Sequence, residues 1–558
     1  MILVLLLSVG AVLAANSQNN DRRQTPATSC ATLKAPTIPN ATVVSIQAAE
    51  RRNFTAPSGG MGAFGAAPLP PLNFCDVNVT LTHGTANDSV RVEVWMPLTG
   101  WNGRFQGTGG GGFIPGTFGS TLAPQVAAGF SAASTDAGLH PASFDGSGIV
   151  FNDQLMTNFA FLSVHEMALV GKAVSQQFYG TAPKFSYWNG CSTGGRQGYM
   201  EAQSFPEDFD GILAAAPAIN WGKFCPAEFW PFQVQTEANE FVPACVLTGL
   251  TQANIQACDA LDGGMDGLIS DPSVCRFDAN TIIGKTVPCN STTVTVSANQ
   301  ASIYNKIISG PVDNNGTRLW FGVEPGTNFN SLAATTPFNL GSTWLDTFVG
   351  NRAQLGGQLS RNNTLSAQTY SSLFEESIAS KFGKMLATDN ANLTQLKSTG
   401  HKLLSWHGLA DTIIMPQGTF DYRQRVETMM GGAAAVDQFY RLFVAPGVGH
   451  CGGGGPSPNT ATALNVLINW VENGVAPETL PANITTRNVT VSRNLCRFPL
   501  VAHFNGTGDL NSAAGWTCIP SQGQLASPPA VPAGASATGP LMLGWVASAI
   551  LVAGWLVI

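Results

Sequence analysis

Charged side chains are scarce in this chain, and no run of basic residues occurs in it. Only 11% of the 558 residues are charged, and 34 acidic against 27 basic residues leave a formal net charge of −7. A mildly acidic chain without basic clusters argues against nucleic acid as a partner. Hydrophobic residues make up 44% of the chain, which excludes a mainly disordered protein.

The length fits three or four domains of about 150 residues, or one large α/β domain with an insertion. Glycine and proline number 61 and 34, which is above average usage but below the low-complexity range. We therefore expect a loop-rich globular protein.

The N-terminus lacks the basic residues that usually begin a secretory signal peptide, but otherwise follows that pattern. Residues 1–15 (MILVLLLSVGAVLAA) are apolar and end in small residues, and the polar run NSQNNDRRQ follows. This pattern predicts a signal peptide over residues 1–16. A buried N-terminal helix is the alternative.

The C-terminal tail lacks charge altogether. Residues 540–558 (PLMLGWVASAILVAGWLVI) follow the small, proline-rich segment SPPAVPAGASATG, and no Lys or Arg comes after them. Small residues, a spacer and a terminal apolar tail are typical of a glycosylphosphatidylinositol (GPI) anchor signal, whereas a membrane-spanning helix is usually followed by cytoplasmic basic residues. We assign residues 521–558 to a linker and a GPI-type tail. A membrane-spanning helix is one alternative, and a tail that is neither a GPI signal nor a membrane span is the other. The candidate attachment residues are Ala533, Gly534, Ala535 and Ser536.

Glycosylation signals and cysteines agree with export. Eleven N-x-S/T sequons are present, at Asn40, Asn53, Asn78, Asn87, Asn290, Asn315, Asn362, Asn392, Asn483, Asn488 and Asn505. The chain also has 11 cysteines, most of which should pair in an oxidising compartment, with at least one left over. We predict a secreted glycoprotein, with GPI anchoring at the cell surface under the first reading of its tail.

The chain alternates between strand-like and helix-like segments in two stretches. Expected strands are at 88–97, 104–107, 129–135, 185–189, 211–216, 402–407 and 438–444, and expected helices at 153–179, 193–204, 417–430 and 459–472. This order predicts a mainly parallel sheet with helices on both faces. The alternation breaks over 223–395, so we expect an α/β core in two parts, 17–222 and 396–520, interrupted by a cap over 223–395.

A nucleophile motif lies between an expected strand and an expected helix. Residues 190–194 read G-C-S-T-G, which is the G-x-S-x-G pentapeptide with Ser192 at its centre. The two glycines permit the sharp turn that lifts the serine hydroxyl clear of the sheet. A Gly/Ser turn without chemistry is the alternative.

The acid and base should follow the serine in the order Asp, His. Asp411 lies in the turn after strand 402–407, and His450 lies in the loop after strand 438–444. Asp421 and Asp437 are rivals for the acid, but their places on a helix or at a strand edge also explain them. His407 and His165 are expected to have structural roles.

These residues carry a family resemblance. A cysteine precedes the serine and another follows the histidine, in the segments NGCSTGGRQG, SWHGLAD and APGVGHCGGG. Over about residues 30–520 the chain resembles the tannase and feruloyl esterase family. The resemblance implies an α/β-hydrolase core with a large inserted lid, acting on esters of aromatic acids.

The same reading assigns the catalytic steps. Ser192 attacks the ester carbonyl, His450 takes its proton, and Asp411 orients the imidazole. The oxyanion needs backbone N–H donors, of which Thr193 is one. The glycine run 109–112 resembles the family's glycine-rich turn, and within it Gly111 or Gly112 is expected to be the second donor.

An acidic loop lies between Cys258 and Cys275. Its aspartates and glycines suit Ca²⁺, although it is not an EF-hand, since Ser270 stands where Glu is required. A solvated acidic turn is the alternative. By its resemblance to the family's lid calcium loop, the segment would bind a structural Ca²⁺ through the carboxylates of Asp259, Asp262 and Asp266 and the carbonyls of Gly264 and Leu268.

Several disulfides are expected. Cys191 and Cys451 are each adjacent to a candidate catalytic residue, so the meeting of Ser192 and His450 would bring them within roughly the 4.4–6.8 Å Cα separation that a disulfide needs. The flanking positions of Cys258 and Cys275 predict a bond between them. The resemblance adds Cys30–Cys75 and Cys496–Cys518. We also expect Cys225–Cys245, with Cys289 unpaired.

The preferred function is hydrolysis of feruloyl (hydroxycinnamoyl) esters of plant cell-wall polysaccharide. A tannase acting on gallate esters is the near alternative. A catalytically inactive, calcium-binding surface protein is the alternative of another class, and the three residues Ser192, Asp411 and His450 argue against it.

Overall fold

The computed structural model describes residues 25–56, 69–140, 142–147, 152–349, 359 and 365–523. The expected signal peptide, the C-terminal tail with its candidate attachment residues, and Asn362 lie outside these residues. Within the described part of the chain, no helix is both long and apolar enough to cross a bilayer.

The core is one large mixed sheet of eleven strands, in the order β1-β2-β3-β5-β4-β6-β7-β10-β11-β13-β12. Neighbouring strands from β5 to β11 are parallel, and the strands at both edges are antiparallel. The strands are β1 Thr42–Phe54, β2 Leu72–Thr82, β3 Val90–Pro97, β4 Arg104–Thr108, β5 Ser131–Thr135, β6 Phe185–Cys191, β7 Gly211–Ala215, β10 Lys402–Gly408, β11 Tyr440–Ala445, β12 Thr479–Thr486 and β13 Val489–Arg497.

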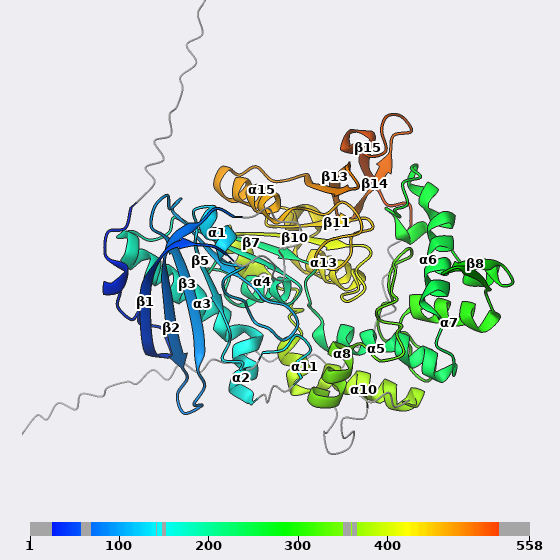
Figure 1. Cartoon of the computed structure of the whole chain (residues 1–558), viewed down its shortest axis with the longest axis horizontal. Coiled ribbons are helices and arrows are strands. Elements are labelled where there is room, and N and C mark those ends of the chain that lie inside the picture. Colours follow the sequence, from blue (N-terminus) through cyan, green and yellow to red (C-terminus); the bar gives the residue numbers. More distant parts are fainter. Residues whose placement is uncertain are drawn as a thin grey trace, which may run out of the picture.

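Helices cover both faces of the sheet, as the alternating pattern predicts (Figure 1). One apolar cluster joins the sheet to α3, α4 and α13, and two others join it to α15 and α1. The expected helix 153–179 is interrupted by a π-helical turn. The helices of the core are η1 Cys30–Thr32, α1 Ala123–Ala127, α2 Asp153–Thr157, the π turn η2 Asn158–Leu162, α3 Ser163–Tyr179, α4 Thr193–Ser204, α13 Gln417–Met430, α14 Ala433–Val436 and α15 Thr460–Asn473.

The segment between β7 and β10 forms a separate helical layer, here called the helical insertion (residues 221–399). It contains most of the largest apolar cluster and lies beside the sheet in Figure 1, in green. Its elements are α5 Trp221–Glu237, α6 Ala244–Cys258, η3 Asp259–Asp262, η4 Pro272–Val274, η5 Ala279–Ile282, β8 Thr286–Cys289, β9 Thr292–Thr295, α7 Ala298–Ser309, α8 Asn339–Thr343, the π turn η6 Trp344–Val349, α10 Ala367–Ala379, α11 Lys381–Leu386 and α12 Thr394–Thr399.

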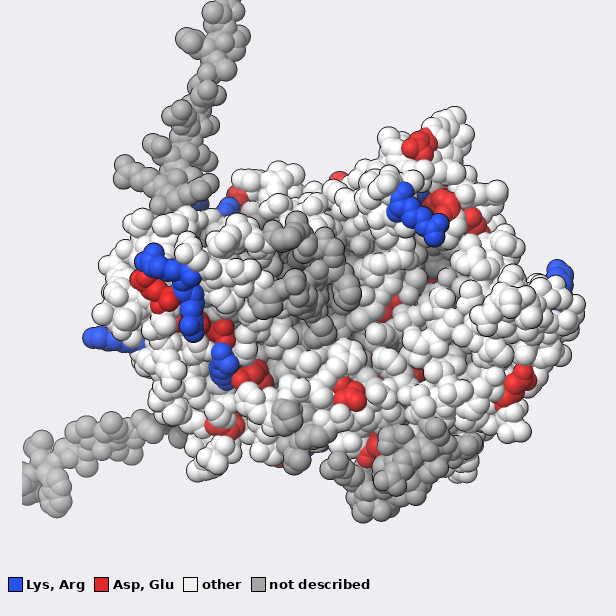
Figure 2. All heavy atoms as spheres, viewed as in Figure 1, with Lys and Arg blue, Asp and Glu red and all other residues white. Residues whose placement is uncertain are grey.

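A hairpin near the end of the described part of the chain contacts the insertion. Strands β14 Leu500–Phe504 and β15 Trp516–Pro520, with η8 Ala513–Gly515 before β15, lie beside the acidic loop. Arg493 pairs with Asp266 of that loop, and Ser521 donates to Asp271 at 2.8 Å. On the face drawn in Figure 2, charged side chains are scattered among uncharged ones, in keeping with the low charge of the chain.

Five disulfides are present. The pairs Cys30–Cys75, Cys258–Cys275, Cys496–Cys518 and Cys191–Cys451 are those expected from the sequence.

The expected Cys225–Cys245 bond is wrong. Cys245 instead bonds Cys289, and Cys225 is free. The reason is the packing of the insertion: α6 lies against β8, with Gly249 close to Val287, which brings Cys289 to the start of α6. Cys225 faces the core from α5 and is fully buried.

Candidate active site

Ser192 stands at the turn between β6 and α4. Its backbone has φ 63° and ψ −123°, a conformation that side-chain-bearing residues rarely adopt. The neighbouring glycines make the turn feasible. A Cβ atom on Gly190 would lie 2.4 Å from the carbonyl oxygen of Gly194, and one on Gly195 would lie 2.3 Å from that of Ala215. The pentapeptide thus forms the strained strand-to-helix turn that its sequence predicts.

Asp411 and His450 follow the neighbouring parallel strands β10 and β11. The carboxyl ends of parallel strands meet at one edge of the sheet, which is also the edge where β6 ends at Cys191. His450 Nδ1 lies 2.8 Å from Asp411 Oδ2. The side chain of Asp411 is fully buried, whereas that of His450 is 15% exposed. The acid therefore lies behind the base, away from solvent.

A disulfide joins the nucleophile turn to the histidine loop. Cys191 and Cys451 are bonded with a Cα–Cα distance of 5.9 Å, although 260 residues separate them in the sequence. Each is the chain neighbour of a candidate catalytic residue, so the bond keeps Ser192 and His450 close together. Cys451 is exposed and has φ 61°, within a loop of several glycines at positive φ.

The surroundings of Asp411 stabilise its ionised form. Burial by itself would raise the pKa of this carboxyl, but His450 and His407 outweigh burial and hold the pKa below its ordinary value. The backbone N–H groups of Ile413 and Ile414 also donate to Asp411 Oδ1, each at 2.9 Å. An anionic acid fixed in this way can orient His450 and stabilise the imidazolium.

His407 belongs to the same network, which the sequence did not indicate. This fully buried histidine has Nε2 3.1 Å from Asp411 Oδ2 and 3.0 Å from the carbonyl oxygen of Ile414. Because both partners are acceptors, Nε2 carries a proton, and Nδ1 lies 2.9 Å from the Thr419 hydroxyl oxygen. The expected structural role of His407 is thus to support the acid; its spacing of four residues from Asp411 is the only sequence signal for it.

The hydrogen bonds of the glycine run 109–112 indicate which of its N–H groups is available as the second oxyanion donor. The N–H of Gly111 donates to the carbonyl oxygen of Ile114 at 3.0 Å, whereas no described residue accepts from the N–H of Gly112. The Thr193 hydroxyl donates to the carbonyl oxygen of Gly112 at 2.6 Å. This bond ties the glycine turn to the start of α4, so Gly112 and Thr193 lie together beside Ser192.

The other candidates for the acid, Asp421 and Asp437, and the histidine His165 form interactions elsewhere in the core. Asp421 pairs with Arg425 at 2.9 Å, and Asp437 pairs with Arg423 at 2.6 Å. His165 pairs with Asp208 at 2.5 Å and stacks on Phe205. None of these interactions includes Ser192 or His450.

The chain also matches known proteins. Residues 75–519 match the family model described as "Tannase and feruloyl esterase". The chain belongs to the tannase and feruloyl esterase family. A "Probable feruloyl esterase" of Arthroderma benhamiae is 42% identical over 544 residues, which cover 92% of this chain and 98% of that relative. "Feruloyl esterase B" of Aspergillus niger is 30% identical over 79% of this chain and 86% of the relative.

Solved structures show the same fold. A tannin acyl hydrolase from Aspergillus niger superposes with a TM-score of 0.75 at 27% identity, covering 88% of this chain and 94% of that one. Feruloyl esterase B from Aspergillus oryzae superposes with a TM-score of 0.73 at 26% identity, covering 87% and 98%. This family member is therefore a carboxylic ester hydrolase with an α/β-hydrolase core.

The acidic loop of this esterase has the oxygen donors that Ca²⁺ prefers, but they are already engaged. Asp259 accepts from the N–H of Gly267, and Asp262 accepts from the N–H groups of Gly264 and Ser270. Among the described residues, no three acidic, His or Cys side chains converge as a formed metal site.

The charges in this loop remain partly uncompensated. Burial, and then the nearby Asp266, raise the pKa of Asp262 to about 6, and both also raise the pKa of Asp259. The only cation that pairs with the three aspartates among the described residues is Arg493, on Asp266. The donor chemistry fits Ca²⁺, and convergence would require the carboxylates to turn from their present partners.

A buried carboxyl group lies near the candidate acid Asp411. Glu228 of α5 is fully buried, and neither of its carboxyl oxygens has a hydrogen-bond partner among the described residues. Burial, and then the charge of Asp411, raise its pKa well above the ordinary value. Burial therefore favours the neutral form of Glu228, and the sequence did not single it out.

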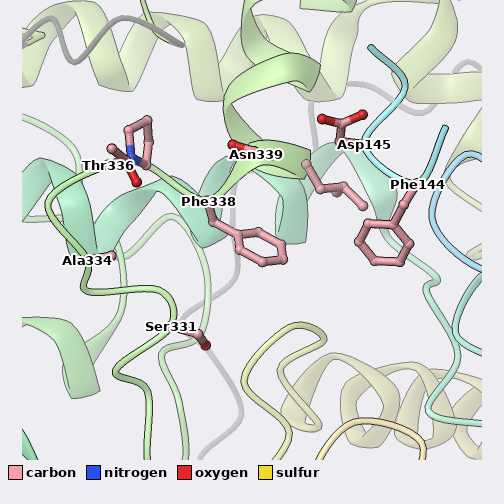
Figure 3. A pocket seen from close by; sticks show the side chains of 9 residues that line it. Phe144, Asp145, Ser331, Ala334, Thr336, Phe338 and Asn339 are labelled. Atoms are coloured by element: carbon pink, nitrogen blue, oxygen red, sulfur yellow. The ribbon is translucent and has the colours of Figure 1, made fainter. Parts of the chain in front are cut away.

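A pocket of about 470 Å³ lies between the insertion and loop 142–147 of the core. In Figure 3 the rings of Phe144 and Phe338 project into the same space from the two sides. Phe144 is also next to the glycine turn, since its carbonyl oxygen accepts from the N–H of Phe113 at 2.9 Å. The pocket therefore borders the segment that carries the candidate oxyanion donor Gly112.

Proposed function

We propose that Ser192, His450 and Asp411 form a catalytic triad that hydrolyses feruloyl (hydroxycinnamoyl) esters of plant cell-wall polysaccharide. The observation that carries the proposal is the contact between His450 Nδ1 and Asp411 Oδ2 at 2.8 Å, in a loop bonded to the nucleophile turn through Cys191–Cys451. The relatives named feruloyl esterase support the choice of acid.

In this mechanism His450 Nε2 takes the proton of Ser192 as its oxygen attacks the ester carbonyl. The N–H groups of Thr193 and Gly112 stabilise the negative charge on the tetrahedral oxygen. His450 then gives the proton to the departing alcohol, and water releases the aromatic acid from the acyl-enzyme. Asp411 stays ionised throughout, in keeping with its lowered pKa.

Substitution of the nucleophile tests the mechanism. Ser192→Ala should lose ester hydrolysis by a factor of at least about 1,000 and should no longer react with a fluorophosphonate probe, while its melting temperature stays close to that of the wild type. Ser204→Ala, at the exposed end of the same helix, is the control and should keep full activity. Near-normal turnover in Ser192→Ala would refute the triad. Failure of the wild type to react with the probe would instead favour an inactive calcium-binding surface protein.

Gallate esters are the second candidate substrate. The tannin acyl hydrolase has the higher of the two TM-scores given above, 0.75, which is the observation that favours them. The values of kcat/KM for methyl ferulate, methyl caffeate and methyl gallate decide between the two. A preference for methyl gallate would make the enzyme a tannase.

We also propose that the acidic loop binds a structural Ca²⁺ through Asp259, Asp262 and Asp266 and the carbonyls of Gly264 and Leu268. The donor set supports it, because three carboxylates and two backbone carbonyls in one short loop are the hard oxygen ligands that Ca²⁺ prefers. Elemental analysis of the purified protein and its melting temperature with and without chelator are the tests. Absence of metal, together with an unchanged melting temperature, would leave only an acidic turn.

Export is the last part of the proposal. Five disulfides suit an oxidising compartment, and nine of the ten described sequon asparagines are exposed. We infer a secreted glycoprotein with a GPI-type C-terminal signal. Release of the protein from cell surfaces by phosphatidylinositol-specific phospholipase C tests the anchor.

A further inference from the structure

Arg196 is a buried cation on the nucleophile helix that the mechanism above does not use. It lies one turn after Ser192 in α4, and its side chain is fully buried. Among the described residues it has no carboxylate partner. Burial lowers its pKa to about 9, so it remains charged at neutral pH. A buried charge is costly unless several groups solvate it, so the groups around Arg196 indicate what it holds together.

The first group is the π-helical turn η2. Arg196 Nη1 donates to the carbonyl oxygen of Ala160 at 2.8 Å, and Nη2 donates to that of Phe159 at 3.0 Å. The two terminal nitrogens of the guanidinium thus donate to two consecutive carbonyl oxygens, a geometry that a lysine cannot reproduce. Single π turns within helices occur frequently at functional sites.

The second group lies where the chain enters the helical insertion and where it turns back toward the sheet near residue 388. Asn220, just before α5, donates its N–H to the carbonyl oxygen of Ala387 at 2.7 Å, which holds the outgoing and returning chain together. Arg196 Nη1 reaches the hydroxyl of Thr388 at 3.4 Å, in the returning segment. Asn220 and Thr388 both have positive φ, at 61° and 49°, so the backbone is strained where the insertion meets the core.

The third group is the first residue of the insertion. The guanidinium carbon of Arg196 lies 6.0 Å from the ring of Trp221 and 5.3 Å from that of Phe159. Trp221 in turn packs edge-to-face on Phe113, with ring centroids 5.1 Å apart. Phe113 directly follows Gly112, so one chain of contacts runs from the nucleophile helix through the insertion to the oxyanion turn.

We propose that Arg196 is a positioning residue that fixes the helical insertion relative to the nucleophile helix α4. It joins the nucleophile helix to Trp221 and Thr388 of the insertion and to the π turn, so it sets where the insertion lies relative to the reacting serine. The proposal rests on the proposed esterase function. The proposal predicts that Arg196 affects some substrates and not others. Hydrolysis of an ester that contacts the insertion depends on Arg196, whereas hydrolysis of a small ester that needs only Ser192 and the oxyanion donors does not.

The test compares two esters in the same enzyme. We measure kcat/KM for methyl ferulate and for 4-nitrophenyl acetate, each per active site titrated with a fluorophosphonate. In Arg196→Met the ratio of the two values should fall by about 10- to 100-fold, the scale of a misplacement of about 1 Å, mainly through a higher KM for methyl ferulate. Arg196→Lys should recover part of the loss, because it restores the charge and one of the two carbonyl contacts.

Arg423 offers a matched control. It is also a buried arginine of a core helix, but among the described residues its hydrogen bonds and ion pairs are with Glu427, Asp437 and Tyr440, all of them in the core. Arg423→Met should lower the melting temperature and leave the ratio within about 2-fold of the wild type, since lost stability alone affects both substrates equally.

The outcomes separate this inference from the proposed function. A wild type that hydrolyses both esters, with an unchanged ratio in folded Arg196 variants, overturns the positioning role alone. A wild type that hydrolyses neither ester refutes the esterase function itself. If both Arg196 variants fail to fold, Trp221→Leu decides: it removes the ring beneath the guanidinium, and an unchanged ratio in it overturns the proposal.

Discussion

Removal of the Cys191–Cys451 disulfide should cost this enzyme activity out of proportion to stability. The bond spans 260 residues, and the chain-entropy relation then gives about 5 to 6 kcal/mol of stabilisation as an upper figure. Its local effect is on the loop around His450, where Gly447, Gly452, Gly453 and Gly454 all have positive φ. Such a loop loses much conformational entropy on ordering, so without the bond His450 should sample more positions.

The assay separates the two effects. In Cys191→Ala/Cys451→Ala, kcat per titrated active site should fall by about 10- to 100-fold, because a shift of about 1 Å at the base has that effect. The matched control is Cys30→Ala/Cys75→Ala, which removes a bond spanning 45 residues at the edge of the sheet. The same relation gives that bond about 4 kcal/mol, so the control should lose stability but keep kcat.

Mild reduction adds a second measurement. Cys451 is exposed, whereas Cys30 and Cys75 are buried, so a thiol reductant should reduce Cys191–Cys451 before Cys30–Cys75. Activity should therefore fall before the melting temperature reflects loss of the other bonds. A double variant with wild-type kcat well below its melting temperature would refute the reasoning, as would free thiols at positions 191 and 451 in fully active enzyme.

Three further predictions concern the surroundings of the site. His407→Phe should lower kcat by about 10-fold, because Asp411 loses the buried donor that helps to hold its carboxylate in place. His165→Phe is the control and should keep kcat; an unchanged kcat in His407→Phe would refute the supporting role. The pKa of Asp262 is raised from 3.8 to about 6, so between these pH values the folded state keeps a proton that the unfolded state releases. Without metal, the free energy of unfolding of wild type minus that of Asp262→Asn, from denaturant titrations, should therefore fall as the pH rises from about 4 to 6. Added Ca²⁺ should reverse this trend, and a difference that does not change with pH in either condition would refute the prediction. Gly447→Ala should destabilise the protein by about 1–2 kcal/mol because residue 447 has a φ of 66°. The loss should be larger still, because the new Cβ would lie 2.4 Å from Leu268 Cδ2. Adding Leu268→Ala to this variant should restore part of the melting temperature, and no restoration would show that the contact does not contribute.

The sequence by itself determined the family and the order of the core elements. The pentapeptide around Ser192 and the strand–turn pattern before Asp411 and His450 are local features, and local features depend on neighbours a few residues away. The expected strands and helices from 88 to 222 and from 402 to 472 accordingly match β3 to β7 and β10 to α15 closely. The family resemblance rested on the same short segments and agrees with the family match over residues 75–519.

Only the tertiary structure decided which distant groups meet. The pairing of Cys245 with Cys289 depends on how α6 packs against β8, and nothing in the spacing of three leftover cysteines specifies that packing. The choice of Gly112 over Gly111 depends on a single turn bond to Ile114, and the support of Asp411 by His407 depends on the path of the chain through Ile414. The contacts of Arg196 with the π turn and with Trp221 and Thr388 of the insertion join segments up to 192 residues apart. Hydrogen bonds and packing contacts of this kind form after the chain has folded back on itself, so no local pattern in the sequence records them.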